Sequence, residues 1–340
     1  MNNIEKIKII NRASINEDKS VYKRQFSKEK GYLGNCEFIF DVSQRKYNWL
    51  VVIDDLPRTL PNRTEILNCP PENTILVTTE PDTITKYGKA FASQFKYLIT
   101  NQDEKALPHP NAIRSQTGNV WFYGKDYDEI VTFKEPNKTK KLSTVCSDKQ
   151  QGHTIHKLRY DFTKIMEDKI SELERFGKGF KWIETKAEAI DDYEFHVAIE
   201  NHYAPHVWTE KLADTFLGYA VPIYYGCPNI FEYFPEDSII LIDIYDIESS
   251  IEKIKEIISI PGEYERRLPA VKEARRRVIE EYNLLAMINK IVTENSNSKK
   301  LEIFSENKIY NRRKMRTKNL SDLFSFIAWK IKNFLKNIKG

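Results

Sequence analysis

The chain has 340 residues, of which 30% are charged and 41% hydrophobic, and a formal net charge of +4. This length is sufficient for two domains of ordinary size, each with its own core. The four cysteines are scattered without a C-x-x-C pair, and no 18 consecutive residues are apolar, which argues against a disulfide framework and a membrane-spanning helix.

The first half contains four short apolar runs that predict strands of an α/β domain. They cover residues 37–40, 49–53, 74–78 and 97–100, and residues 86–95 predict a helix between the last two. Prolines lie between these runs and not inside them, which is typical of loops. We therefore place the first domain at residues 1–140.

The second half continues the alternation of strands and helices. Strands are predicted at residues 142–146, 180–183, 195–199, 221–225 and 239–242, and helices at 155–175, 247–258 and 264–292. Such alternation favours parallel sheets with right-handed crossovers. The second domain is placed at residues 141–305, and a separate tail at residues 306–340.

Residues 195–226 contain a buried strand, a polar loop, a helix start and a second buried strand in direct succession. The first strand ends at Glu200 and Asn201, and Thr209 can cap a helix that carries Glu210 and Lys211 in its first turn. In open α/β sheets, ligands bind outside the carboxyl ends of parallel strands, where helix N-termini present free N–H groups to anions. This order of elements predicts a ligand site.

The order and spacing of these residues resemble the donor-binding motif of glycosyltransferase family 10, the α-1,3/α-1,4-fucosyltransferases. That pattern runs F-x-x-x-x-E-N, a short loop, T-E-K and then V/I-P-I/V-Y-x-G. The matching residues are Phe195, Glu200, Asn201, Thr209, Glu210, Lys211, Val221, Pro222, Ile223, Tyr224 and Gly226. The resemblance covers about residues 75–250 and includes weaker matches at Arg159 and Lys186.

The resemblance implies a GT-B fold, with two Rossmann-like domains facing a central cleft, and an inverting transfer of fucose from GDP-fucose to a GlcNAc- or galactose-containing surface glycan. The leaving diphosphate must then be stabilised by cations and N–H groups. Arg159 and Lys211 match the family residues that hold this diphosphate, and Glu210 matches the carboxylate that binds the ribose. Asn201 is expected to contact the donor from the end of its strand.

Glu200, Lys186 and Tyr224 are weaker candidates for the same donor site. The general base is expected from the first domain, because that domain supplies the acceptor side. Residues 74–78 predict a buried strand that leads to Glu80, and family members carry a Glu-containing loop after the corresponding strand. We therefore predict that Glu80 is the base; the alternative is an acid on a surface loop.

Two departures from the family pattern affect the donor side: His202 stands where Ser is common, and Val207 where many members have an aromatic residue. One alternative is the same fold with another nucleotide-sugar donor. A second is a non-catalytic, membrane-associated protein that binds a glycan or nucleotide. His153 and His156 could suggest a metal, but no third ligand lies at suitable spacing and the relevant loop has no D-x-D, so no metal or cofactor is expected besides the GDP-fucose substrate.

Residues 308–340 carry ten lysines and arginines but a single acid, Asp322. A helical apolar stripe runs through them, comprising Leu320, Leu323, Phe324, Ile327, Ile331, Phe334, Leu335 and Ile338. A basic amphipathic helix of this kind, with Trp329 near its boundary, is typical of binding to an anionic membrane surface. The alternatives are that the stripe packs on the catalytic domains or that the basic run binds nucleic acid, and the helix explains the charges better than the latter.

The scattered cysteines and the lack of a secretory h-region predict a reducing cytoplasm. We therefore expect a bacterial cytoplasmic enzyme that is peripheral on the inner face of the cell membrane through residues 320–339, with no nucleic-acid partner.

Overall fold

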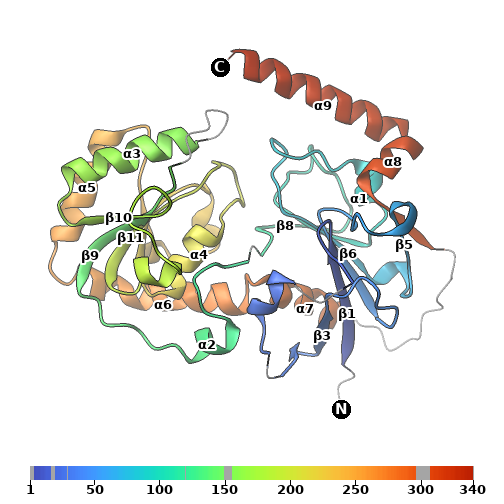
Figure 1. Ribbon diagram of the computed structural model, residues 1–340, viewed down its shortest axis with the longest axis horizontal. Coiled ribbons are helices and arrows are strands. Elements are labelled where there is room, and N and C mark those ends of the chain that lie inside the picture. The colour runs from blue at the N-terminus through green and yellow to red at the C-terminus, as the bar shows by residue number, and fades with distance from the viewer. Residues whose placement is uncertain are drawn as a thin grey trace. The chain divides into compact units, whose positions relative to one another are not determined.

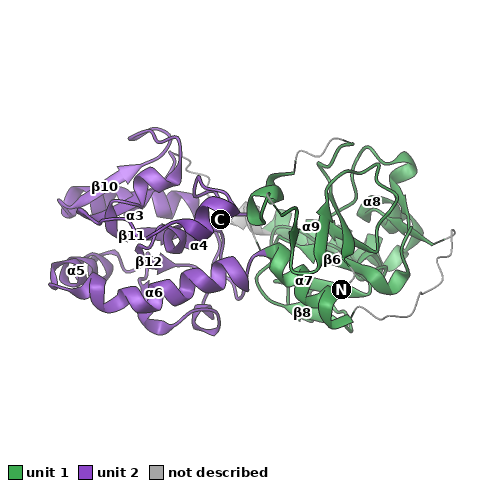
Figure 2. Ribbon diagram, turned by 90° about the horizontal axis from the view of Figure 1, so that it is seen from below, with its two compact units in different colours: residues 1–118, 284–340 green, residues 119–283 purple. Residues whose placement is uncertain are grey.

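The computed structural model describes residues 4–16, 20–28, 30–118, 120–148, 155–295 and 307–339. The chain forms two compact units, each built around a largely parallel sheet (Figure 1). Unit 1 comprises residues 1–118 and 284–340, and unit 2 comprises residues 119–283 (Figure 2). The predicted α/β class is confirmed.

The sheet of unit 1 has seven strands in the order β2-β3-β1-β4-β6-β7-β8, and every pair is parallel except β2 with β3. Its strands are β1 Glu5–Asn11, β2 Tyr32–Leu33, β3 Cys36–Ile39, β4 Trp49–Ile53, β6 Thr74–Thr78, β7 Tyr97–Thr100 and β8 Ala112–Arg114. The central strands are nearly continuous apolar runs, because both faces of a parallel sheet are covered. Their register places Val51 of β4 between Ile9 of β1 and Ile75 of β6.

Helices cover the two faces of this sheet. On one face, Leu285 and Ile288 of α7 (Leu284–Asn295) pack with Ile7 and Trp49. On the other, Phe91 of α1 (Lys89–Ala92) packs with apolar side chains of β4 and β6. The C-terminal part of the chain adds β14 (Lys308–Tyr310), which pairs with β5 (Thr64–Ile66), followed by α8 (Arg312–Lys318) and α9 (Leu320–Lys339).

Unit 2 contains a five-stranded, wholly parallel sheet in the order β10-β9-β11-β12-β13. Its strands are β9 Lys140–Val145, β10 Leu173–Phe176, β11 Tyr193–Ile199, β12 Val221–Tyr225 and β13 Ile240–Leu241. Its helices are α2 Tyr127–Thr132, α3 His156–Lys169, α4 Glu210–Leu217, α5 Ile247–Ser259 and α6 Glu263–Glu280. Phe162, Phe195, Leu212 and Phe216 are fully buried in one core that joins α3 and α4 to the sheet.

Several predicted elements need correction. The helix predicted at 155–175 ends at Lys169, and residues 173–176 form β10 instead. Residues 180–183 form no strand, and the helix at 86–95 is reduced to the single turn of α1. The helix predicted at 264–292 is two helices, α6 and α7, which belong to different units. Strand β1, an interior strand of the first sheet between β3 and β4, is absent from the prediction.

The domain boundaries also differ from those predicted. The boundary expected at residue 140 lies at residues 118 and 119, because Ile130 of α2 is buried in the core of unit 2. Residues 284–295 were assigned to the second domain but form α7 on the sheet of unit 1. The tail is not a separate region either: β14 completes a two-stranded sheet with β5, and Ile309 is buried in the core of unit 1.

Candidate donor site and candidate base

Glu200 joins the carboxyl end of β11 to the start of α4. Its side chain is 1% exposed, and its two carboxylate oxygens accept hydrogen bonds from the backbone N–H and the hydroxyl of Thr209, each at 2.7 Å. Thr209 is the N-cap of α4, where its hydroxyl accepts the N–H of Lys211 at 3.4 Å. Glu200 therefore positions the helix start that carries the T-E-K residues.

Lys211 lies between two carboxylates at this helix start. Its ammonium nitrogen is 3.3 Å from Glu200, 3.2 Å from Glu210 and 3.0 Å from the Thr209 hydroxyl. Burial lowers the pKa of Lys211, but the two carboxylates outweigh burial and hold the pKa above its usual value. Burial likewise opposes ionisation of Glu210, yet Lys211 and Lys186 lower its pKa to about 2. Both side chains are therefore charged at neutral pH.

Asp214, which was not among the predicted site residues, holds Lys186 beside Glu210 and Lys211. The Lys186 ammonium nitrogen is 2.6 Å from Asp214 and 3.9 Å from Glu210. Asp214 is fully buried on α4, where it also accepts the N–H of Phe122 at 2.9 Å, and burial raises its pKa to about 6. An acidic residue inside the apolar segment 212–217 was the available signal for this partner.

Arg159, on α3, approaches the same strand ends. Its Nη1 atom donates to the side-chain oxygen of Asn201 at 2.9 Å. Arg159 is buried, with 8% of its surface exposed. Its Nε atom is buried and has no hydrogen-bond partner among the residues that the structure describes. The guanidinium also acts electrostatically on Lys211. Two cations, one with an unused donor, thus converge at the carboxyl edge of the sheet, which suits a bound anion.

Tyr224 lies behind this site. It is fully buried in β12, and its hydroxyl accepts the N–H of Cys227 at 3.0 Å. A Cβ atom at Gly226 would lie 2.5 Å from both Glu200 Cγ and the Tyr224 hydroxyl oxygen, so only glycine fits there. Tyr224 therefore supports the loop after β12, and its expected contact with a donor stays a prediction.

Glu80 follows β6 at the carboxyl edge of the other sheet. Its loop is fixed by Asp54, which accepts the N–H and hydroxyl of Thr79 at 2.7 and 2.6 Å, and by Gln102, which donates to the Glu80 carbonyl oxygen at 2.9 Å. The Glu80 carboxylate has no hydrogen bond within the described part of the chain. Glu80 is an exposed residue, and partial desolvation, followed by the charge of Asp54, raises its pKa, which brings a carboxylate closer to the range of a base at neutral pH.

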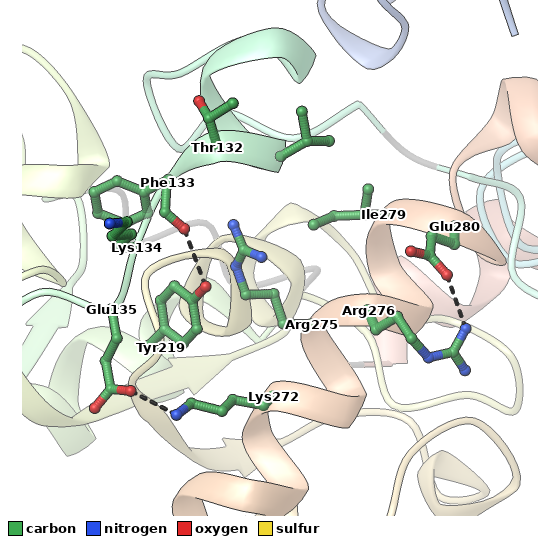
Figure 3. A pocket seen from close by; sticks show the side chains of 11 residues that line it. Thr132, Phe133, Lys134, Glu135, Tyr219, Lys272, Arg275, Arg276, Ile279 and Glu280 are labelled. Carbon is green, nitrogen blue, oxygen red and sulfur yellow. Dashed lines mark hydrogen bonds and ion pairs between the residues drawn. The ribbon is translucent and has the colours of Figure 1, made fainter.

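A further cavity of about 540 Å³ in unit 2 contains none of the predicted residues (Figure 3). Three of its four cations have protein partners: Lys272 is 2.7 Å from Glu135, Arg275 donates to two backbone carbonyl oxygens at 2.6 and 3.2 Å, and Arg276 forms ion pairs with glutamates. Its residue Tyr219 lies two positions before β12, so the cavity lies at the amino ends of the strands. We therefore assign the donor site to the opposite edge.

Of the two histidines that could suggest a metal, only His156 is among the residues that the structure describes. His153 lies outside the described residues, and the described residues contain no group of three His, Cys, Asp or Glu side chains that could hold a metal ion. Among the helices described, none is both long and apolar enough to cross a membrane.

The two parallel-sheet units have the GT-B fold of solved glycosyltransferases. Residues 135–270 match the model of the glycosyltransferase family 10 (fucosyltransferase) C-terminal domain. The chain is therefore a glycosyltransferase with a family 10 domain, and this confirms the resemblance noted in its sequence.

Among solved structures, the chain is similar to an alpha1,3-fucosyltransferase with GDP-fucose, with 14% identity, a TM-score of 0.50, and coverage of 86% of this chain and 91% of that one. Structures of alpha1,3-fucosyltransferase with GDP and without a named ligand give 13% identity and a TM-score of 0.47 at the same coverage. The first of these similarities supports the fold. No curated protein sequence matches the chain.

Proposed function

We propose that the protein is an inverting α-1,3-fucosyltransferase that transfers fucose from GDP-fucose to a hydroxyl of a GlcNAc- or galactose-containing glycan. The family 10 domain supports the reaction class, and the GDP-fucose of the similar solved enzyme supports the donor. The observation that carries the proposal is the convergence of Arg159 and Lys211 beside Glu210 at one strand edge.

In this proposal each donor-site residue has a distinct role. Arg159 offers its unused Nε donor, and Lys211 its positive charge, to the oxygens of the diphosphate. The ionised Glu210 accepts hydrogen bonds from the ribose hydroxyls, and Asn201 contacts the donor while it orients Arg159. Glu200 and Lys186 hold the helix start in position through Thr209 and Asp214.

Transfer is a single in-line displacement. Glu80 accepts the proton of the acceptor hydroxyl as that oxygen forms a bond to the anomeric carbon of fucose. The bond between the anomeric carbon and the diphosphate oxygen breaks at the same time, and GDP leaves with the electron pair. Arg159 and Lys211 stabilise the charge that develops on the leaving diphosphate.

Turnover with a small panel of donors and acceptors tests the proposal. We expect GDP-fucose to be consumed with N-acetyllactosamine-type disaccharides, and GDP-mannose and UDP-galactose to be poor donors. Nuclear magnetic resonance of the product should show an α-linked fucose on a ring hydroxyl. Transfer of another sugar would favour the alternative donor, whereas GDP binding without any transfer would favour the non-catalytic alternative.

We also propose that α9 attaches the enzyme to an anionic membrane surface. Six apolar residues form an exposed stripe along this helix: Leu320, Phe324, Ile327, Ile331, Phe334 and Leu335. They are 44–66% exposed, so the stripe is available to lipid, and the helix belongs to the basic part of the chain. The side chain of Ile338, which also belongs to the predicted stripe, lies outside the described part of the chain.

The opposite side of α9 packs against the rest of unit 1. Asp322 accepts the N–H groups of Ala90 and Phe91, each at 3.1 Å, and the indole N–H of Trp329 donates to the Asp82 carbonyl oxygen at 2.7 Å. Trp329 thus also contacts the protein, and its expected place at a membrane boundary stays a prediction. The two alternatives for the tail apply to different sides of the same helix: one side packs on the enzyme, and the other is left for lipid.

A further inference from the structure

Unit 1 contains an arginine-lined depression at the carboxyl edge of its sheet. Two cavities of about 310 and 330 Å³ share Arg12, Asp55 and Arg313, so they adjoin each other. Arg12 directly follows β1, and Asp55 lies two residues beyond β4. Helix α8 supplies Arg313 from the far end of the chain. We call this the arginine cavity.

The lining of the arginine cavity is strongly basic. Its cations are Arg12, Arg58, Arg63, Lys86, Arg312, Arg313 and Arg316, whereas Asp55 is its one acidic residue. The carboxylate of Asp55 is already occupied: it accepts the N–H groups of Leu56 and Arg312, each at 3.0 Å, and lies 3.3 Å from the Arg312 guanidinium. Among the described residues, Arg312 is the only one of the six arginines in an ion pair.

Part of the cavity is preorganised by aromatic side chains. The guanidinium of Arg316 lies 3.6 Å from the centre of the Phe326 ring, which stacks on Trp329, and it donates to the Lys86 carbonyl oxygen at 2.9 Å. Burial and the neighbouring Arg312 lower the pKa of Arg316. Like charges held together at a hollow surface repel each other unless an anion lies between them.

We propose that the arginine cavity binds a phosphate group carried by the acceptor glycan. Guanidinium groups pair with phosphate in a bidentate manner, and a phosphate monoester near neutral pH carries nearly two negative charges, which calls for more than one arginine. The cavity includes Thr85 and Lys86 from the loop that contains Glu80, so the phosphate would be held on the same loop as the proposed base. This inference rests on the proposed function, in which unit 1 receives the acceptor.

Calorimetry on the full chain, saturated with GDP to fill the donor site, tests the binding directly. The probes are N-acetylglucosamine 1-phosphate and N-acetylglucosamine. We expect the phosphorylated sugar to bind at least about tenfold more tightly, and the double variant Arg12→Gln/Arg313→Gln to lose this preference. Both arginines are exposed, so folding should be retained, which a thermal midpoint checks. The control is Lys105→Gln, an exposed cation of unit 1 outside the cavity.

Three outcomes would overturn the inference. The first is equal binding of both sugars, and the second is an unchanged preference in the double variant. In the third, the double variant loses binding to anionic phospholipid vesicles but keeps its binding of the sugar phosphate, which would make the cavity a lipid headgroup site. Transfer from GDP-fucose to a neutral disaccharide is measured in parallel. If that transfer persists while the phosphate has no effect on sugar binding, the inference fails and the proposed function stands. Absence of transfer to every acceptor refutes the proposed function itself.

Discussion

Arg159 and Lys211 have the same charge but different surroundings, and this difference can be measured. Lys211→Ala should remove a cation from between Glu200 and Glu210 and so reduce both activity and stability. Arg159→Ala, in contrast, leaves two neutral acceptors, the Asn201 amide and the Ile199 carbonyl, without their partner. Each loss should cost about 2–4 kcal/mol of transition-state stabilisation. Initial rates and thermal midpoints measured together separate the two effects.

The control for these variants is Lys157→Ala, because Lys157 is an exposed residue on the same helix as Arg159 and pairs only with Asp161. It should leave both rate and midpoint unchanged. Rates close to those of the wild type in Arg159→Ala and Lys211→Ala would remove both residues from the diphosphate site.

Glu80→Gln should separate binding from chemistry. The proposed base acts on the acceptor proton, so GDP should bind normally while turnover falls by at least about a hundredfold. Because the base must be ionised, wild-type activity should decline as the pH falls through the pKa of Glu80, which partial desolvation raises above 4.5. The residual activity of Glu80→Gln should lack this acid limb.

Calorimetry with GDP and rate–pH profiles provide the two measurements. Glu72→Gln changes an exposed acid of the same unit and serves as the control. A parallel loss of GDP binding and rate would identify Glu80 as a structural residue instead.

The sequence predicted which residues lie together where their spacing was local. Glu200, Asn201, Glu210 and Lys211 lie within twelve positions of one another, and the structure brings them to one strand edge. Residues whose role depends on a distant partner were missed. Asp54 became visible only through its hydrogen bonds to Thr79, which lies 25 positions further along the chain.

At the scale of elements, β1 was missed for the same reason. Its sequence carries Lys8, which is fully buried and lies 2.7 Å from the equally buried Glu65 of β5. A lysine inside a short run indicates a solvated strand or loop unless its partner is known. The arginine cavity could not be predicted either, because its residues come from five separate stretches of the chain.

The pair of Lys8 and Glu65 gives a prediction about stability. Lys8→Met leaves a buried carboxylate without its closest cation and should lower the free energy of unfolding by about 3–5 kcal/mol. The double variant Lys8→Met/Glu65→Leu should recover most of this loss, because neither charge is then buried alone. Denaturant unfolding measures both changes.

Lys6→Met provides the comparison on the same strand, since Lys6 lies 3.6 Å from Glu37 in a largely exposed pair. It should change the free energy of unfolding by less than about 1 kcal/mol. A double variant no more stable than Lys8→Met would show that the cost comes from packing and not from charge.

For α9, the triple variant Phe324→Ser/Ile331→Ser/Phe334→Ser should abolish sedimentation with anionic vesicles. These side chains are exposed, so the thermal midpoint and the turnover of soluble acceptors should persist. Added salt should weaken the binding of the wild type without abolishing it, because salt screens the lysines but not the apolar stripe. Trp182→Ser, which removes an apolar side chain that is 73% exposed in unit 2, should leave vesicle binding intact. A triple variant that still sediments would contradict the membrane proposal.

At the scale of the whole molecule, the residues proposed for the donor site all belong to unit 2. GDP at a hundred times its dissociation constant should stabilise the unit that binds it by about 2.7 kcal/mol. Hydrogen exchange should therefore slow in peptides from residues 119–283, with little change in β1 and β4. Equal protection of both units, with an N-acetylglucosamine titration as control, would contradict a donor site confined to unit 2.

Unit 1 is built from two segments that are separated in the chain by the whole of unit 2. During synthesis on the ribosome, residues 119–283 can complete their contacts while unit 1 still lacks α7 on its sheet, β14 beside β5 and Asp322 on α1. The apolar side chains that await α7, among them Ile7 and Trp49, stay open to water for that interval. The nascent first segment is therefore the part of this enzyme most in need of a chaperone.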